Sequence, residues 1–181
     1  MDHYEGSHAD ATTGLCRCLS RRKDLPDWGK HCTVHPLQVV EAYDPSANSW
    51  SSKPEIPTAV QFTAAVTINA VIYVIASSTL FAFDTSTNVW STKGTSPLDS
   101  GGDLTASAVG SKAYFWDNLR GTEFYEYDPS INAFMALSTR PSMRFWSGSD
   151  AVDGKIYVIG GETNPGTQTA AVSALVEEFT P

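Results

Sequence analysis

The chain has 181 residues, 41% hydrophobic and 11% aromatic, so one domain with a substantial apolar core is the default expectation. Its formal net charge is −8, and an acidic surface repels phosphate backbones, which argues against nucleic acid as a partner. No stretch reaches the roughly 18 consecutive apolar residues of a membrane helix, so we expect no membrane partner either.

Residues 1–38 differ from the rest of the chain and predict an irregular N-terminal segment. All three cysteines and all four histidines lie there. Four of them are potential metal ligands: Cys16, Cys18, Cys32 and His35. Together they could bind zinc tetrahedrally, but the single residue between the first two cysteines fits poorly with the usual zinc spacing. We therefore favour no metal site over this weak zinc candidate. The polar N-terminus has no signal-peptide pattern, which favours free thiols and cytoplasmic residence.

A phrase of 11 residues recurs in the remaining sequence and predicts a repeated β-hairpin. Its copies span residues 40–50, 80–90 and 124–134. In each copy the side-chain types alternate with the period of two that is typical of a strand, and an Asp-Pro or Asp-Thr turn follows. An Asn then stands two residues before a large aromatic ring. The Asn suits the left-handed position that closes a hairpin loop. Because the ring keeps its offset, we predict that Trp50, Trp90 and Phe134 occupy equivalent positions and are largely buried between neighbouring sheets.

A second phrase precedes this hairpin and predicts two further strands in each unit. Its clearest copy spans residues 150–161, where Asp153-Gly154 is a strong hairpin signal. The strand after that turn, residues 156–159, is apolar on both faces, which is typical of a sheet with neighbours on both sides. The repeated Asn positions are 40 and then 44 residues apart, and four strands at this period indicate a repeat architecture.

The order of the two phrases resembles the kelch repeat of β-propellers. Residues 153–161 match the first part of that repeat, residues 40–50 match the second, and the resemblance covers residues 39–181. Two departures stand out: the glycine pair occurs once, as Gly160-Gly161, and the period is shorter than the roughly 50 residues typical of kelch repeats.

The resemblance implies an all-β fold, a β-propeller built of four-stranded antiparallel blades. Characterised propellers have about four to eight blades, and this chain has material for about three to four kelch-like ones, so we expect an incomplete propeller. The blades are expected at approximately 39–60, 62–96, 104–138 and 146–181. Two alternatives are that two copies close a ring and that residues 1–38 supply degenerate strands. The unfinished last blade should leave an unpaired edge, which favours self-association.

The resemblance also implies a protein–protein interaction module, a binding scaffold that stands alone or within a larger protein. Related repeats often carry an arginine at the channel entrance, and Arg144 occupies that place; an ordinary surface arginine is the alternative. The loop after the second strand of the third blade is expected to hold Trp116, Asp117 and Arg120. Exposed Trp and Arg are good binding anchors, although Trp116 could instead pack between blades. Trp146 is the remaining binding candidate.

The alternative function is a propeller enzyme, such as a sugar epimerase or a galactose-oxidase-like relative. Residues 39–181 contain neither His nor Cys, which removes the usual protein ligands of copper. Acid–base chemistry by carboxylates remains possible in principle, but Glu177 and Glu178 are neighbours on a predicted strand and should point to opposite faces. We favour the interaction module, assign no catalytic residue and expect no cofactor.

Overall fold

The computed structural model describes residues 16–17, 36–60, 63–98, 103–118, 124–138, 142–164 and 167–181. Their regular structure is all β-strand, as the sequence predicts, and the chain divides into two compact units, Met1–Ala59 and Val60–Pro181. Within the described ranges, no helix is long and apolar enough to span a membrane.

The first unit contains one small antiparallel sheet. Its strands, in the order β1-β2-β3, are β1 (Cys16–Arg17), β2 (Val40–Asp44) and β3 (Ser49–Lys53). The hairpin predicted for residues 40–50 is thus present. Within the segment where we expected irregular structure, Cys16 pairs with Ala42 of β2.

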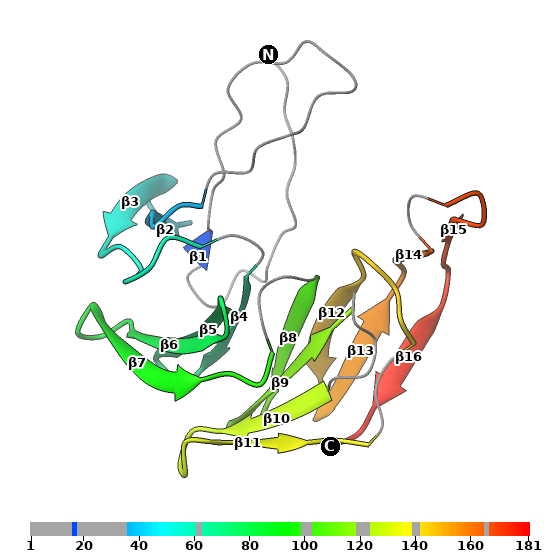
Figure 1. Cartoon of the computed structure of the whole chain (residues 1–181). Helices are drawn as coiled ribbons and strands as arrows, with labels where there is room; N and C mark the ends of the chain where they lie inside the picture. The colour runs from blue at the N-terminus through cyan, green and yellow to red at the C-terminus, as the bar shows by residue number, and fades with distance from the viewer. Residues whose placement is uncertain are drawn as a thin grey trace. The chain divides into compact units, whose positions relative to one another are not determined.

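The second unit contains three larger antiparallel sheets and one short hairpin (Figure 1). The first sheet has β4 (Ala64–Ile68), β5 (Val71–Ala76), β6 (Thr79–Asp84) and β7 (Val89–Thr95). The second has β8 (Leu104–Val109), β9 (Lys112–Asp117), β10 (Phe124–Asp128) and β11 (Ala133–Ala136). The third has β12 (Gly148–Val152), β13 (Lys155–Ile159) and β16 (Val176–Phe179). The short hairpin joins β14 (Glu162–Thr163) and β15 (Ala171–Val172).

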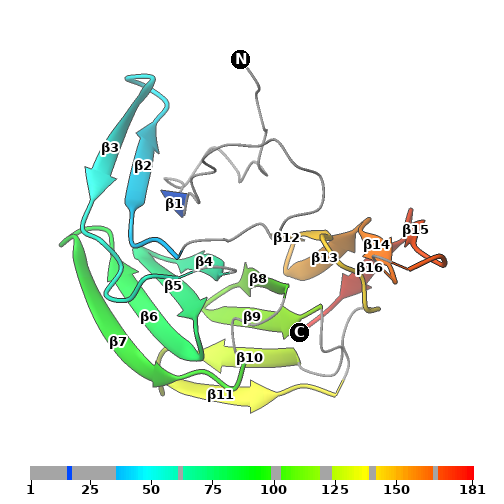
Figure 2. The ribbon, with the colours of Figure 1, turned by 45° about the horizontal axis from the view of Figure 1, so that its top comes forward.

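These sheets confirm the predicted incomplete kelch blades. The first two are four-stranded, with strands in chain order, and the third lacks a fourth strand among the described residues. Figure 2 shows the three sheets side by side, with β8 next to both β4 and β12. The first strand of each sheet therefore lies on the inner side of the second unit.

The core of the second unit lies between successive sheets, and β9 shows how the sequence builds it. Ala113 and Phe115 on one face of β9 pack with the first sheet, while Tyr114 and Trp116 on the other face pack with the third. Side chains alternate along a strand, so a fully apolar strand can bury both faces at once.

The sequence predicts this two-sided burial for residues 156–159, and there it is wrong for one face: Ile156 and Val158 are each 1% exposed, whereas Ile159 is 54% exposed. The third sheet is the last large sheet of the described residues, so that face has no further sheet packed on it.

The hairpin turns have the predicted chemistry. Asn48, Asn88 and Asn132 all adopt positive φ, of 48°, 57° and 51°. The aspartate that opens each turn accepts hydrogen bonds from the serine two residues later; for Asp84 these are 2.6 Å from the Ser86 hydroxyl and 2.8 Å from its backbone N–H. These bonds stabilise the carboxylate and hold its pKa below the ordinary value.

The three rings that follow the turns are equivalent, but their predicted burial is wrong for one of them. Trp50, Trp90 and Phe134 each pair across the hairpin with an aromatic residue, at ring-centroid distances of 5.1, 4.9 and 4.9 Å. Trp90 and Phe134 are half-buried, whereas Trp50 is 50% exposed. The difference follows from what else the rings contact. Phe134 also packs against the core between the first two sheets, and Trp90 also lies edge-on to Phe81 at 6.5 Å. Trp50, in contrast, packs on Tyr43 of its own hairpin.

Candidate functional site

Two residues predicted from the sequence, Arg144 and Trp146, lie on the segment 142–147 that leads into β12. They differ in exposure: Arg144 is 1% exposed and Trp146 is 69% exposed. The segment thus combines a buried cation with an exposed indole two residues away. We take it, with the residues that hold it, as the candidate site.

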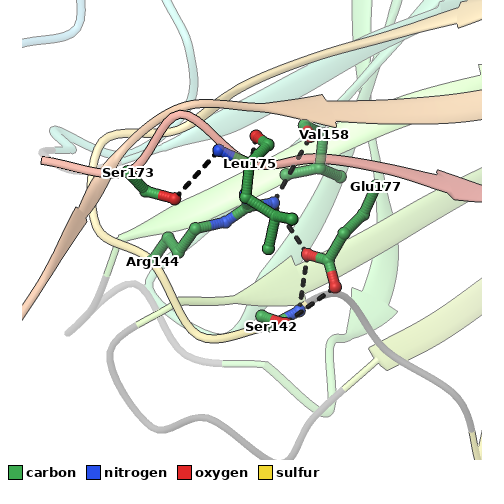
Figure 3. Close-up of polar contacts among 6 residues, drawn as sticks. All are labelled: Ser142, Arg144, Val158, Ser173, Leu175 and Glu177. Atoms are coloured by element: carbon green, nitrogen blue, oxygen red, sulfur yellow. Dashed lines mark hydrogen bonds and ion pairs between the residues drawn. The ribbon is translucent and has the colours of Figure 1, made fainter.

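Arg144 is buried against the third sheet and holds its strands together, where we had expected an exposed side chain (Figure 3). Its guanidinium donates to the carbonyl oxygen of Leu175 at 2.8 Å and to that of Val158 at 3.3 Å. It also forms an ion pair of 2.7 Å with Glu177. These partners lie on or just before β13 and β16, so the arginine ties the segment to both strands.

Glu177 holds a second point of the same segment. Its carboxylate accepts the Ser142 backbone N–H at 2.9 Å and the Ser142 hydroxyl at 2.7 Å. The neighbouring Glu178 instead binds Lys155 at 2.6 Å and the Tyr157 hydroxyl at 2.9 Å. The two carboxylates therefore act on opposite faces of β16, as the strand alternation predicts.

The glycine pair explains how the segment approaches the sheet so closely. Phe145 exchanges two backbone hydrogen bonds of 2.9 Å with Glu162, directly after Gly161. A Cβ atom on Gly161 would lie 2.8 Å from the Phe145 carbonyl oxygen and 3.0 Å from the Cβ of Arg144. Gly161 also has a φ of +96°, which other residues rarely adopt. The second glycine of the pair is therefore required for the segment to pack at this place.

Trp146 is presented in an unusual backbone conformation. Its φ is +55°, and the left-handed region costs a non-glycine residue about 1–2 kcal/mol. The Trp146 backbone N–H donates to a carboxylate oxygen of Asp103 at 2.7 Å, and this charge-assisted bond stabilises the turn. The indole lies against the ring of Phe145, with centroids 6.2 Å apart. The backbone that carries the exposed ring is thereby held in place.

Asp103 was not singled out as a site residue from the sequence, and the end of β9 positions it. The backbone N–H of Asn118 donates to the Asp103 carbonyl oxygen at 2.9 Å. The Asn118 side chain, which is 3% exposed, donates to Thr105 at 2.9 Å. Asp103 and Trp146 are 43 positions apart, so no local pattern could have indicated their contact.

Trp116 and Asp117 are the last two residues of β9, so the expected loop placement is wrong. They pair with Thr105 and Leu104 of β8, which extends the strand to Asp117. Trp116 is 2% exposed and packs edge-on against Phe124 at 5.7 Å, which confirms the alternative that it packs between sheets. Asp117 is 3% exposed.

The remaining sequence candidates fall outside the described side chains. Arg120, Cys18, Cys32 and His35 lie outside the described residues, and Cys16 is described by its backbone alone. Among the side chains that the structure does describe, no three His, Cys, Asp or Glu residues are grouped to hold a metal ion.

Comparison with known proteins points to the same repeat. The chain is 26% identical to Kelch-like protein 35 from Mus musculus over 144 residues, which is 75% of this chain. It is 29% identical to Kelch-like protein 25 from Xenopus tropicalis over 128 residues, or 60% of this chain. The chain is similar to kelch-repeat proteins. No protein-family model matches it.

The kelch match covers a small part of the relatives. The aligned region is 25% of the length of the first relative and 20% of the second. Within this chain the third sheet carries the fullest kelch pattern, because it alone has a glycine pair directly after its second strand. That pair is what admits the segment bearing Trp146, so the most complete kelch unit is also the one that presents the exposed indole.

Proposed function

We propose that this kelch-repeat chain is an interaction module that binds a protein partner through the surface around Trp146. The observation that carries the proposal is the 69% exposed indole on a backbone fixed by Asp103 and by the Phe145–Glu162 bridge. Tryptophan is among the residues that most often dominate a protein interface. A segment whose backbone is already fixed loses little backbone entropy on binding, which favours affinity.

The surroundings of Trp146 suit a scaffold role. Arg144 and Glu177 are bound to each other and to the sheet, so they support the segment from within. Trp116 and Asp117 form the buried end of β9, directly before Asn118, which positions Asp103. Arg120 follows this strand end in the sequence, and we propose it as a second contact. In this proposal the buried candidates position the surface, and Trp146 and Arg120 bind the partner.

The partner proposed is a protein, with neither nucleic acid nor membrane. The net charge of −8 disfavours phosphate-rich surfaces, and Asp103 places a carboxylate directly beneath Trp146. Cytoplasmic residence is part of the same proposal and is tested by cell fractionation. Self-association by pairing along the edge of β16, the last strand of its sheet, is proposed as the alternative to the sheet-face contact described in the next section.

Site-specific photo-cross-linking tests the proposal. A photoreactive phenylalanine analogue replaces Trp146 in one chain and Val172, which is 89% exposed on β15, in a matched control. In extracts of the source cells we expect a cross-linked protein at position 146 that is absent at position 172. Excess unlabelled native chain should compete it away, and excess Trp146→Ala chain should not. Identical products at both positions, or none at position 146, would contradict the proposal.

A further inference from the structure

Successive sheets of the second unit repeat one packing face, and the last copy of that face is uncovered. The second strand of each sheet carries one tyrosine at the equivalent position of the register. Tyr73 lies opposite Ala82, Tyr114 opposite Glu126, and Tyr157 opposite Glu178. Tyr73 packs in the core shared with the second sheet, and Tyr114 in the core shared with the third. Each of these faces thus receives the next sheet along the chain.

The exposures show how completely the first two copies are covered and how open the third is. Two residues after the tyrosine, Ile75 is 0% and Trp116 is 2% exposed, whereas Ile159 is 54% exposed. On the neighbouring strand Leu80 and Phe124 are each 1% exposed, and the equivalent Val176 is 56% exposed. We call the surface formed by Lys155, Tyr157, Ile159, Val176 and Glu178 the terminal face.

The polar groups of the terminal face have the same arrangement as a set of polar groups that is covered on the second sheet. On the second sheet Glu126, 8% exposed, accepts hydrogen bonds from Lys112 and from the Tyr114 hydroxyl. On the terminal face Glu178 binds Lys155 and Tyr157 in the same way. A buried carboxylate must be paired and hydrogen-bonded, and this arrangement satisfies that need beneath the third sheet. On the terminal face the Glu178 carboxylate is likewise paired with Lys155 and Tyr157, so this face too can be covered by another surface.

An aromatic residue from the next sheet seals each covered face. The ring of Tyr127 lies 5.4 Å from Tyr73, and that of Phe179 lies 4.9 Å from Phe124 and 6.1 Å from Tyr114. Tyr127 and Phe179 are equivalent, since they pair with Ala113 and Ile156 at the same place on the preceding strand. The terminal face therefore needs an aromatic residue at this position of another hairpin.

The β2–β3 hairpin presents such a residue. Tyr43 donates its hydroxyl to Asn48 at 2.7 Å and packs on Trp50, just as Tyr127 donates to Asn132 at 2.8 Å and packs on Phe134. Trp50 is 50% exposed, so the ring pair is available for contact.

We propose that the terminal face of one chain binds the Tyr43–Trp50 pair of a second copy, head to tail. The contact continues the interface that joins the sheets within the chain. It uses two different surfaces of the molecule, so it is a heterologous contact, and a single such contact joins two copies. It does not involve Trp146, and it differs from pairing along the β16 edge because it buries side chains of the sheet face.

Association of the full chain, 19.5 kDa as a monomer, is measured by sedimentation equilibrium over a range of concentrations. Ile159→Glu removes the terminal face and Trp50→Glu removes the aromatic pair. Ile131→Glu, at a hairpin-turn residue that is 72% exposed, is the matched control for an added charge. The native chain, the control and Trp146→Ala should associate, and each face variant should weaken association at least about tenfold.

Mixing the two face variants decides the geometry. Each retains one intact surface, so the mixture should form a one-to-one pair while neither variant associates alone. A variant that had merely unfolded could not be rescued in this way, and circular dichroism checks the fold of each. The proposal is overturned if the native chain is monomeric throughout, if Trp50→Glu still associates, if Ile159→Glu still associates as edge pairing would allow, or if the mixture stays monomeric.

Discussion

Replacing Gly161 by alanine should disrupt the segment that presents Trp146. Two effects add at this position. Alanine is strained at a φ of +96°, and its Cβ would lie 2.8 Å from the carbonyl oxygen of Phe145. That oxygen belongs to the backbone and cannot swing aside as a flexible side chain would. The segment must therefore move away from the sheet.

The magnitude follows from what that movement breaks. Left-handed strain costs roughly 1–2 kcal/mol, and the reduced freedom of the unfolded chain returns about 0.4–1 kcal/mol. The two backbone hydrogen bonds between Phe145 and Glu162, both 2.9 Å, contribute about 0.5–1.5 kcal/mol each. Gly161→Ala should therefore lower the free energy of unfolding by about 2–4 kcal/mol. Gly154→Ala, at a φ of +76° with nothing within 4 Å of the added Cβ, should lose about 1 kcal/mol or less.

Urea unfolding followed by circular dichroism gives both free energies, and the difference between the two variants isolates the steric effect from the strain. Hydrogen exchange should also be faster at the Phe145 and Glu162 amides in Gly161→Ala and unchanged in Gly154→Ala. If the two variants lose equal stability and these amides stay protected, the close approach of the segment does not depend on the missing side chain.

Four further outcomes are expected. Arg144→Ala should cost about 2–4 kcal/mol of unfolding free energy in urea titrations, because it removes one donor from Glu177 and from each of two carbonyl groups. A loss below about 1 kcal/mol would contradict its role in tying the segment to the sheet. Trp116→Ala should cost about 3–5 kcal/mol by the same assay, and a near-neutral result would mean that the ring is not a core element. The carboxyl pKa of Asp84 should lie below 3.8 by NMR titration, because the Ser86 hydroxyl and then backbone N–H groups bind its charged form. The contribution of this carboxylate to stability is present above its unfolded-state pKa and is lost as pH falls through its folded-state pKa. A measured pKa at or above 3.8 would refute the turn geometry. Burial raises the pKa of the Tyr127 hydroxyl to about 12. The contribution of this group to stability is therefore present below pH 10 and is lost as pH rises through about 12. Ionisation of Tyr127 near pH 10, followed by tyrosinate absorbance, would contradict its burial.

Local chemistry made the repeat predictable from the sequence. The turn around Asp84 and Asn88 is determined by residues within five positions, and Asn132 repeats it in the next sheet. The two buried faces of β9 follow from a run of apolar residues that no one-sided strand would need. Such features depend on neighbours in the chain, so a single sequence contains them.

What escaped prediction depends on contacts between distant residues. Arg144 is buried because Glu177, 33 positions later, and two strand carbonyls surround it. Trp146 is fixed by Asp103, and nothing in the sequence around either residue indicates the other. Trp50 has the same local sequence context as its half-buried counterparts, but its exposure depends on which more distant residues pack against the ring.

The dissociation constant of the protein that cross-links at position 146 tests the central claim most directly. Isothermal titration calorimetry compares the native chain with Trp146→Ala and with Val172→Ala, which removes a similarly exposed apolar side chain. If Trp146 is the anchor of the interaction surface, its truncation should weaken binding by about 30-fold or more, while Val172→Ala should bind within about threefold of the native chain. Equal affinities for all three chains would show that binding does not occur through Trp146.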